Sequence, residues 1–301
     1  TNYQLPITNY QLPITNYQVA TVSPQITEIA SFPFPMPDFL IIGAQKSGTS
    51  SLYYYLAQHP QIVAVPHKEI HFFSFHYTQG WDWYRSQLGM TSPDRTHDSP
   101  RKLYGEATPY YLFHPLVPPR IYQHIPQVKL IVLLRHPVDR AISHYHHEVK
   151  FGFERATLEE AIALEPDRLK GEVEKLQADP TYHSHNLQHY SYRSRGFYLE
   201  QLQRWMTYFP REQFLILNSE TFYQQPGKTL ARVLDFLHLP PLELANYPSY
   251  NAGNYLRVST SIEQKLLDDF DRPNRELAQY LQDNFGQWDG NWDSMHSQFD
   301  R

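Results

Sequence analysis

The chain has 301 residues, with 31 acidic and 26 basic side chains and no cysteine. The lack of a thiol excludes disulfide scaffolds, cysteine-ligated zinc or iron–sulfur sites and cysteine nucleophiles. A hydrophobic share of 41% is enough to bury a large core, so a globular protein is expected. The formal net charge of -5 argues against a nucleic-acid coat, which carries a basic excess, so any anionic ligand must be held locally.

The N-terminal sequence differs from the rest of the chain. Residues 1–18 repeat the heptapeptide TNYQLPI, and a proline-containing run follows up to Asp38. Such sequence favours an extended tail over packed elements. We predict a low-complexity tail over residues 1–37 and a single domain over residues 38–301. No stretch has the ~20 uncharged apolar residues of a membrane span and no secretory pattern begins the chain, so a soluble, cytoplasmic protein is expected.

Short apolar runs follow the tail. FLIIG, from Phe39, and KLIVLL, over Lys129–Leu134, are typical of strands buried on both faces of a parallel sheet. A third strand is expected from Phe214. Helix-compatible segments follow these strands at residues 50–60, 138–150 and 227–239.

The alternation of strands and helices predicts an α/β fold with a central parallel sheet flanked by helices. The charged, helix-prone segment over residues 157–177 is expected to be a surface excursion. No break in composition requires a second folded domain.

A loop of small and polar residues follows the first strand. It reads Gly-Ala-Gln-Lys-Ser-Gly-Thr-Ser over residues 43–50 and leads into a helix. The start of a helix has unpaired N–H groups and a partial positive charge, and small residues let the backbone close around phosphate oxygens. An ordinary strand-to-helix turn is the alternative, but the order of strand, loop and helix favours a phosphate loop. The predicted anion-binding residues are Lys46, Ser47, Gly48, Thr49 and Ser50.

The loop departs from the nucleotide-binding P-loop, in which a lysine follows the second glycine. Thr49 stands at that position, and Lys46 lies earlier in the loop. The strand KLIVLL is followed by Arg135, where a P-loop NTPase has an acid that completes its magnesium site. Read alone, Arg135 could also be a surface ion-pair partner. Together the departures indicate an anionic nucleotide bound without a metal.

With these residues assembled, the chain resembles the sulfotransferases that use 3'-phosphoadenosine 5'-phosphosulfate (PAPS), from about Phe39 to about Trp288. The branch that it resembles most is the heparan-sulfate-like branch with its bacterial relatives. The family's 5'-phosphosulfate loop is matched by the sequence KSGTS, which begins at Lys46. Its 3'-phosphate element, Arg-x-Pro followed by Arg-Ala-x-Ser-x-Tyr, is matched by RHPVDRAISHY, which contains Arg135 and Ser143.

The resemblance implies a P-loop-NTPase-like, three-layer fold. It also implies PAPS as the co-substrate, adenosine 3',5'-bisphosphate as the product and no metal. Lys46 is then placed to neutralise charge on the departing phosphate, and Arg135 and Ser143 would hold the 3'-phosphate.

Two weaker matches suggest the catalytic base. KEIHFF, from Lys68, looks like the family's Lys-Glu-Pro-His-Phe-Phe, and GEATPYY, from Gly105, looks like its Glu-x-Thr-Pro-x-Tyr. The first match implies that Glu69 is the general base. The alternative for Glu69 is an ion pair with Lys68 or Arg85. His71 either orients Glu69 or the acceptor, or it is a packed histidine.

The C-terminal part departs from the family. Where relatives often have a Lys-Gly-Arg loop near the 3'-phosphate and adenine, residues 252–255 read Ala-Gly-Asn-Tyr and have no cation. Arg257 is a candidate substitute. The residues predicted to contact the donor on this side are Tyr250, Gly253, Asn254 and Tyr255.

Other features are set aside. The clusters His144, His146, His147 and His183, His185, His189 lack a metal-protease motif, and solvated or acceptor-contacting histidines are preferred to a metal site. The run Tyr53–Tyr55 is expected to pack a helix. The aromatic residues 81, 83 and 84 either line a sugar-binding cleft or pack in the core.

Three functions fit these sequence features. The first is a PAPS-dependent sulfotransferase acting on a carbohydrate or another hydroxylated acceptor, without nucleic-acid partners. The second is a metal-dependent P-loop nucleoside or sugar kinase, which the missing lysine after Gly48 disfavours. The third is a non-catalytic nucleotide-binding relative, which the presence of Lys46 and Glu69 disfavours. The acidic balance also disfavours a heavily sulfated polyanion as the acceptor.

Overall fold

The computed structural model describes residues 36–65, 67–90, 101–250 and 259–285. Five parallel strands form its sheet, in the order β2-β3-β1-β4-β5. Their bounds are Phe39–Gly43 for β1, Ile62–Val63 for β2, Leu103–Ala107 for β3, Lys129–Leu134 for β4 and Phe214–Asn218 for β5.

The helices follow the strands in the alternation expected of an α/β fold. Their bounds are Thr49–Leu56 for α1, Gly80–Gln87 for α2, Val117–His124 for α3, Pro137–Lys150 for α4, Leu158–Leu169 for α5, Glu172–Ala178 for α6, His185–His189 for α7, Tyr198–Met206 for α8, Ser219–Gln224 for α9, Pro226–Phe236 for α10 and Thr260–Phe285 for α11. Short 3₁₀ turns lie at Tyr77–Gln79, Ser194–Gly196 and Arg211–Gln213.

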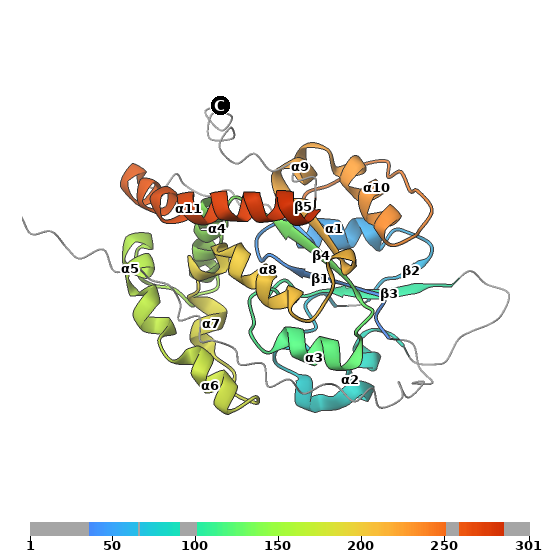
Figure 1. The fold of residues 1–301 in the computed structure, drawn as a ribbon, viewed down its shortest axis with the longest axis horizontal. Coiled ribbons are helices and arrows are strands. Elements are labelled where there is room, and N and C mark those ends of the chain that lie inside the picture. Colours follow the sequence, from blue (N-terminus) through green and yellow to red (C-terminus); the bar gives the residue numbers. More distant parts are fainter. Residues whose placement is uncertain (1–35, 66, 91–100, 251–258, 286–301) are drawn as a thin grey trace, which may run out of the picture. The chain divides into compact units, whose positions relative to one another are not determined.

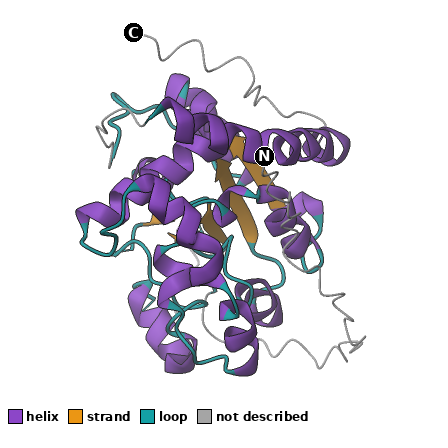
Figure 2. Cartoon of the chain, turned by 90° about the vertical axis from the view of Figure 1, so that its left-hand side faces the viewer, coloured by secondary structure: helices purple, strands orange, loops and turns teal. Residues whose placement is uncertain are grey.

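Helices lie on both faces of the sheet. Helices α1 and α10 lie on one side of the strands and α3 and α8 on the other (Figure 1), and the strands run between helices in the turned view (Figure 2). All five residues of β1 are buried, as expected for a strand covered on both faces. The predicted class, a three-layer α/β fold with a central parallel sheet, is therefore confirmed.

The predicted strands at Phe39, Lys129 and Phe214 are confirmed, and the helix after each is present. Two strands were not predicted. β2 has only two residues, and β3 carries a glycine and a glutamate within LYGEA, so neither has a continuous apolar run. Gly105 is needed in β3 because a Cβ there would lie 2.4 Å from the ring of Phe39 in the neighbouring strand.

The segment after α4 is more buried than the sequence suggested. Residues 157–177 form α5 and α6, and α5 begins with a capping box between Thr157 and Glu160. Leu158 and Ile162 enter a second apolar cluster, to which Tyr192 and Phe270 also belong. One face of α5 is thus buried in a cluster with residues of α4 and α11, whereas the sequence suggested only a surface excursion.

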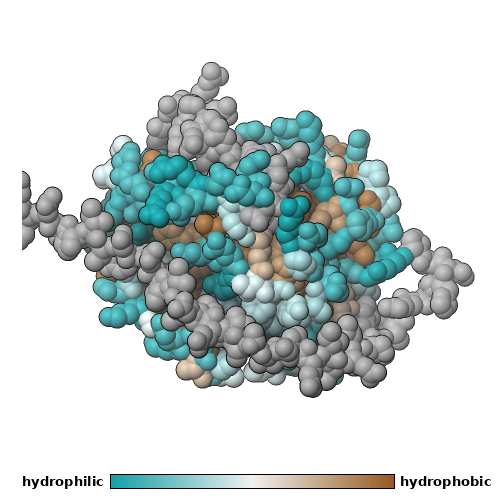
Figure 3. Space-filling model, viewed as in Figure 1, coloured by the Kyte–Doolittle hydropathy of each residue, from teal (hydrophilic) through white to brown (hydrophobic). Residues whose placement is uncertain are grey.

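The carboxyl ends of parallel strands share one edge of the sheet. The phosphate loop follows β1, Arg135 follows β4 and Thr108 follows β3, so all three reach the same edge. β1 lies between β3 and β4, at the centre of the strand order. Open α/β sheets bind ligands beyond the carboxyl ends of their strands, at the point where the strand order reverses. On the face seen in Figure 3, hydrophobic side chains show in the middle and hydrophilic side chains border them.

Candidate active site

The loop between β1 and α1 has the features of an anion site. Gly48 precedes α1 with φ of 92°, a left-handed conformation that glycine adopts without strain. Gly48 has no side chain to cap α1, and the first N–H groups of a helix are the groups that bind an anion at such a position. Ser47 is fully buried, and its Oγ has no hydrogen-bond partner in the part of the chain that the structure describes. These groups fit a phosphosulfate.

Two cations lie at this loop, one within it and one beside it. Lys46 Nζ lies 3.4 Å from Nδ1 of His147 on α4, and Arg135 Nη1 donates to the carbonyl oxygen of Lys46 over 3.2 Å. Burial lowers the pKa of Lys46, the charge of Arg135 lowers it further, and the charges of Glu69 and Glu148 oppose both. The side chain of Lys46 therefore extends from the loop to His147 on α4.

The other predicted donor residues are placed as follows. Thr49 and Ser50 form the first turn of α1, and Ser143 is buried within α4. The N–H of Tyr250 donates to Ser51 Oγ over 3.0 Å, and its ring centroid lies 4.6 Å from that of Tyr54. Gly253, Asn254 and Tyr255, with the proposed substitute Arg257, lie outside the described residues.

The predicted base lies on the segment between β2 and α2. The N–H of Glu69 donates to the carbonyl oxygen of Ala107 over 3.1 Å, which ties this segment to β3. The Glu69 carboxylate is paired with Lys68, and its Oε2 lies 3.7 Å from Nε2 of His71. His71 Nδ1 lies 3.0 Å from Ser74 Oγ, so the His71 ring is held between Glu69 and Ser74.

The electrostatics of Glu69 follow from these contacts. Burial raises its pKa, but the hydrogen bond with His71 and the charge of Lys68 outweigh burial and hold the pKa at about 2. The ion pair with Lys68 that the sequence left open is present, whereas Arg85 pairs with Asp82 instead. Because 41% of the Glu69 side chain is exposed, the carboxylate remains accessible to a ligand.

The backbone singles out the same residues. Among the described residues, positive φ occurs outside glycine at Lys46 (71°), Glu69 (65°), His71 (56°) and His238 (58°). Such conformations are costly for residues with a Cβ and are concentrated at functional sites. Three of these four are the residues predicted to be catalytic.

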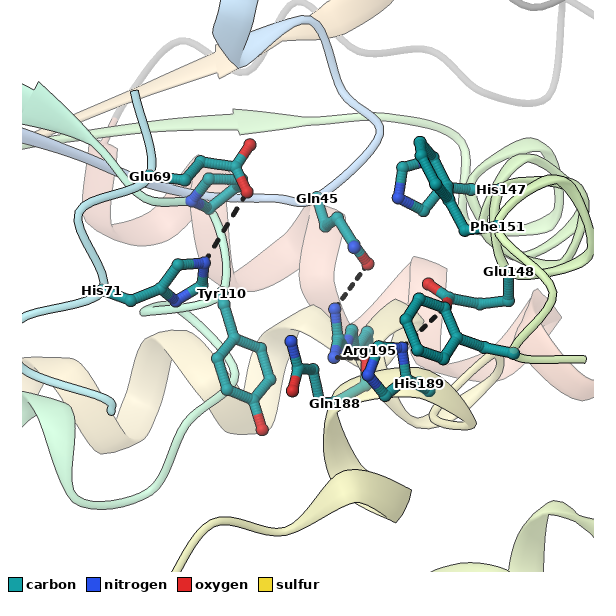
Figure 4. A pocket seen from close by; sticks show the side chains of 12 residues that line it. Gln45, Glu69, His71, Tyr110, His147, Glu148, Phe151, Gln188, His189 and Arg195 are labelled. Atoms are coloured by element: carbon teal, nitrogen blue, oxygen red, sulfur yellow. Dashed lines mark hydrogen bonds and ion pairs between the residues drawn. The ribbon is translucent and has the colours of Figure 1, made fainter. Parts of the chain in front are cut away.

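A cavity of about 290 Å³ lies beside Glu69 and His71. Figure 4 shows these two residues on one side, His147, Glu148 and Phe151 on the other, and Gln45 between them. The lining comes from five separate segments and comprises Gln45, Glu69, His71, Pro109, Tyr110, His147, Glu148, Phe151, Phe153, Gln188, His189 and Arg195.

The structure thus divides the predicted residues into two groups. Glu69 and His71 line the cavity, whereas Lys46 reaches it through its contact with His147. Ser47 to Ser50, Arg135 and Ser143 do not line it: the first four lie in the loop and the first turn of α1, Arg135 lies between β4 and α4, and Ser143 lies in α4. The catalytic and binding roles of all these residues stay predictions.

Most of the cavity wall was not predicted from the sequence. His147 and His189 were expected only as solvated or acceptor-contacting histidines, and no role was predicted for Glu148, Gln188 or Arg195. One signal was available: His147 lies four residues after Ser143, which puts both on one face of α4.

Glu148 is held in the wall by two histidines. Its Oε2 lies 2.7 Å from Nδ1 of His189 on α7, and its Oε1 lies 3.1 Å from Nε2 of His144. Burial raises the pKa of Glu148, but the hydrogen bonds with His144 and His189 outweigh burial and hold it at about 2. Glu148 is therefore ionised at neutral pH, and its contacts join α4 to α7.

Arg195 is a buried cation without a carboxylate partner in the described structure. Its Nε donates to Ser191 Oγ over 2.7 Å, and its Nη2 donates to the carbonyl oxygens of Leu187 and Gln188. Its Nη1 donates to Gln45 Oε1, and the guanidinium lies 4.6 Å from the ring centroid of Tyr110. Arg195 thereby fixes the side chain of Gln45 beside Lys46.

A second buried carboxylate supports the segment that carries Glu69. Glu106 on β3 accepts hydrogen bonds from Tyr84 Oη (2.8 Å), Thr108 Oγ1 (2.7 Å) and Tyr111 Oη (3.0 Å). Thr108 Oγ1 in turn lies 3.5 Å from the N–H of His71. Burial raises the pKa of Glu106, and the three hydrogen bonds counteract that rise.

The structure also locates the histidine clusters and the aromatic residues that the sequence left without a functional role. Among the described residues, no group of three histidine or acidic side chains is arranged to hold a metal ion. Trp81, Trp83 and Tyr84 pack around Phe72 and do not line the cavity, so core packing is the correct alternative for them. Of the tyrosines in α1, Tyr54 is exposed, and residues 53 and 55 are buried as expected.

A loop of small residues, two cations beside it and a nearby carboxylate thus lie at the carboxyl edge of a parallel sheet. A family model of the sulfotransferase domain matches residues 36–265. The chain belongs to this family, which confirms the resemblance drawn from its motifs.

Particular relatives can also be named. The chain is 28% identical over 317 residues to the membrane-associated sulfotransferase kil1 of Dictyostelium discoideum, covering 83% of this chain and 66% of that protein. It is 33% identical over 217 residues to heparan sulfate glucosamine 3-O-sulfotransferase 5 of Mus musculus, covering 71% and 57%. The chain thus spans less than two thirds of the length of these relatives.

A solved structure shares the fold. The sulfotransferase from Alicyclobacillus acidocaldarius matches with a TM-score of 0.64 and 29% identity, covering 79% of this chain and 93% of that one. None of the helices described here is both long enough and apolar enough to cross a membrane.

Proposed function

We propose that this protein transfers a sulfuryl group from PAPS to a hydroxyl group of a carbohydrate acceptor. The observation that carries the proposal is the placement of Glu69 and His71 in a cavity that Gln45 and His147 connect to Lys46 of the phosphate loop. Family membership supports the reaction class, and the heparan sulfate enzymes among the relatives support a saccharide acceptor. The expected cytoplasmic location and bacterial type stay predictions.

The residues divide the reaction between them. Glu69 takes the proton of the acceptor hydroxyl as its oxygen bonds to sulfur, and the bond between sulfur and the 5'-phosphate oxygen breaks. Lys46 and the N–H groups of α1 stabilise the charge that develops on that phosphate. Arg135 and Ser143 hold the 3'-phosphate. The lysine and the backbone donors replace the metal that a P-loop kinase requires.

The resting state of Glu69 sets a condition on this mechanism. A carboxylate with a pKa of about 2 is a weak base, and Lys68 is one cause of that low value. The mechanism therefore requires the Glu69 carboxylate to separate from Lys68 when the acceptor binds. Separation raises the proton affinity of Glu69 and frees an oxygen for the acceptor hydroxyl.

Label transfer tests the proposal against a kinase. The purified protein is incubated with a glycan panel and either sulfur-labelled PAPS with a metal chelator or γ-phosphate-labelled ATP with magnesium. We expect label from PAPS in a glycan and none from ATP. Magnesium-dependent transfer from ATP would show a kinase, and tight binding of adenosine 3',5'-bisphosphate without any transfer would show a non-catalytic relative.

A further inference from the structure

The cavity wall across from Glu69 contains aromatic side chains that remain exposed. Phe151, at the end of α4, is 58% exposed, and Phe153, in the loop that follows, is 43% exposed. Figure 4 shows Phe151 beyond Gln45, on the side away from Glu69 and His71. The ring of Phe151 lies 4.7 Å from that of His147, and Phe153 stacks on His189 at 3.9 Å. Exposed rings inside a cavity are suited to a flat apolar ligand surface.

Histidines aside, the residues that line the cavity carry one more negative than positive charge. These charged residues are the carboxylates Glu69 and Glu148 and the guanidinium of Arg195. The hydrogen bonds of Arg195 go to neutral oxygens, and its location fixes Gln45. Lys150 does not line the cavity; its Nζ lies over the ring of Phe151, 5.8 Å from the ring centroid.

Neutral hydrogen-bonding groups complete the wall. Gln45 Oε1 accepts from Arg195, which leaves the Gln45 amide N–H groups for a ligand. Gln188 Oε1 lies 2.7 Å from His183 Nε2, which leaves the Gln188 amide N–H groups in the same way. Side-chain amides bind hydroxyl groups without requiring a ligand charge.

We propose that the cavity binds an uncharged pyranose ring of the acceptor, with one ring face against Phe151 and the hydroxyl groups toward Gln45, Gln188 and Glu69. This rests on the proposed function and extends it to the acceptor class. A pyranose has C–H groups on its faces and hydroxyl groups on its rim, which matches an aromatic wall with amides beside it. A uronate or sulfated ring would place its negative charge near Glu69, Glu148 and the bound donor.

The experiment compares hydroxylated acceptors that differ in charge. Methyl β-xyloside is neutral, methyl β-glucuronide adds a carboxylate, and heparan sulfate supplies the polyanion. We expect kcat/KM with labelled PAPS to be higher for the xyloside than for either anion by about tenfold or more. Phe151→Ala is expected to raise KM for the xyloside by roughly threefold to tenfold with little change in kcat. Leu164→Ala, an equally simple truncation of an exposed residue on α5, is the matched control.

Several results would overturn the inference. These are a preference for the glucuronide or heparan sulfate, labelling of p-nitrophenol without labelling of the xyloside, and unchanged kinetics in Phe151→Ala. Binding of adenosine 3',5'-bisphosphate, measured by calorimetry, separates this failure from failure of the proposed function. If the nucleotide binds and other hydroxylated acceptors are labelled, only the pyranose assignment is wrong; if it neither binds nor supports any transfer, the proposed function is wrong.

Discussion

The phosphate loop and the cavity beside it are built in different ways. The loop is one continuous stretch between β1 and α1, and its partner Arg135 directly follows β4. The cavity draws on five segments that are as far apart in sequence as Gln45 and Arg195. A continuous site can be read as a motif, because backbone N–H groups and small residues at fixed spacing supply its chemistry. A wall assembled from separate segments has no such spacing.

The largest effect is expected at the point where the two regions meet. Glu69→Gln keeps the shape of the side chain and removes the base, so kcat is expected to fall by roughly 10²-fold to 10⁴-fold. The measurement is single-turnover transfer from labelled PAPS. Asp82→Asn is the matched control because this nearby carboxylate is 96% exposed. A rate for Glu69→Gln equal to that of Asp82→Asn would remove Glu69 from the mechanism.

The next largest effect is expected for a substitution in the phosphate loop. Lys46→Met removes the charge that faces the leaving phosphate, and kcat at saturating PAPS is expected to fall by roughly 10²-fold to 10³-fold. Lys102→Met, at an exposed lysine, should leave kcat unchanged. If Lys46→Met weakens only the binding of PAPS and leaves kcat intact, Lys46 holds the donor without stabilising the leaving group.

The third prediction concerns the buried hydrogen bonds of Glu106, which support the segment that carries Glu69, and their contribution to the stability of the fold. Glu106→Ala removes the acceptor of three buried hydroxyl donors, and the free energy of unfolding is expected to fall by about 3 kcal/mol or more. Urea unfolding measures this, with Glu212→Ala as an exposed control. A fall as small as that of the control would show that the hydroxyl groups of the variant find other partners.

A smaller, pH-dependent effect on the free energy of unfolding is expected for Glu148 in the cavity wall. The folded protein holds the pKa of Glu148 at about 2, below the ordinary value of 4.5, so its ionised form stabilises the fold above pH 4.5. That stabilisation is lost as the pH falls from about 4.5 toward 2. Glu148→Gln should therefore lower the free energy of unfolding by ~1–3 kcal/mol at pH 7, and the difference from the parent should shrink at acidic pH.

Urea unfolding of Glu148→Gln at neutral and acidic pH measures this difference, with Glu174→Gln, an exposed residue on α6, as the control. A difference that is independent of pH would mean that the contacts with His144 and His189 do not depend on the charge of Glu148.

The sequence predicted the parts of the fold and site that are local. The buried strands at Phe39, Lys129 and Phe214 were recognisable because each is a continuous apolar run, whereas β3 was not because Glu106 interrupts it. The burial of that carboxylate depends on Tyr84 and Tyr111, which reach it only through tertiary packing. Phe151 and Gln188 could not be assigned to the cavity for the same reason, since the packing of α4 and α7 brings them together.

The central claim, sulfuryl transfer at the junction of loop and cavity, is tested most directly by product stoichiometry. Adenosine 3',5'-bisphosphate and sulfated glycan are quantified in one reaction of the parent protein with PAPS, a neutral glycan and a metal chelator. Equal amounts of the two products are expected. Nucleotide product without sulfated glycan, or transfer that requires magnesium, would contradict sulfuryl transfer at this site.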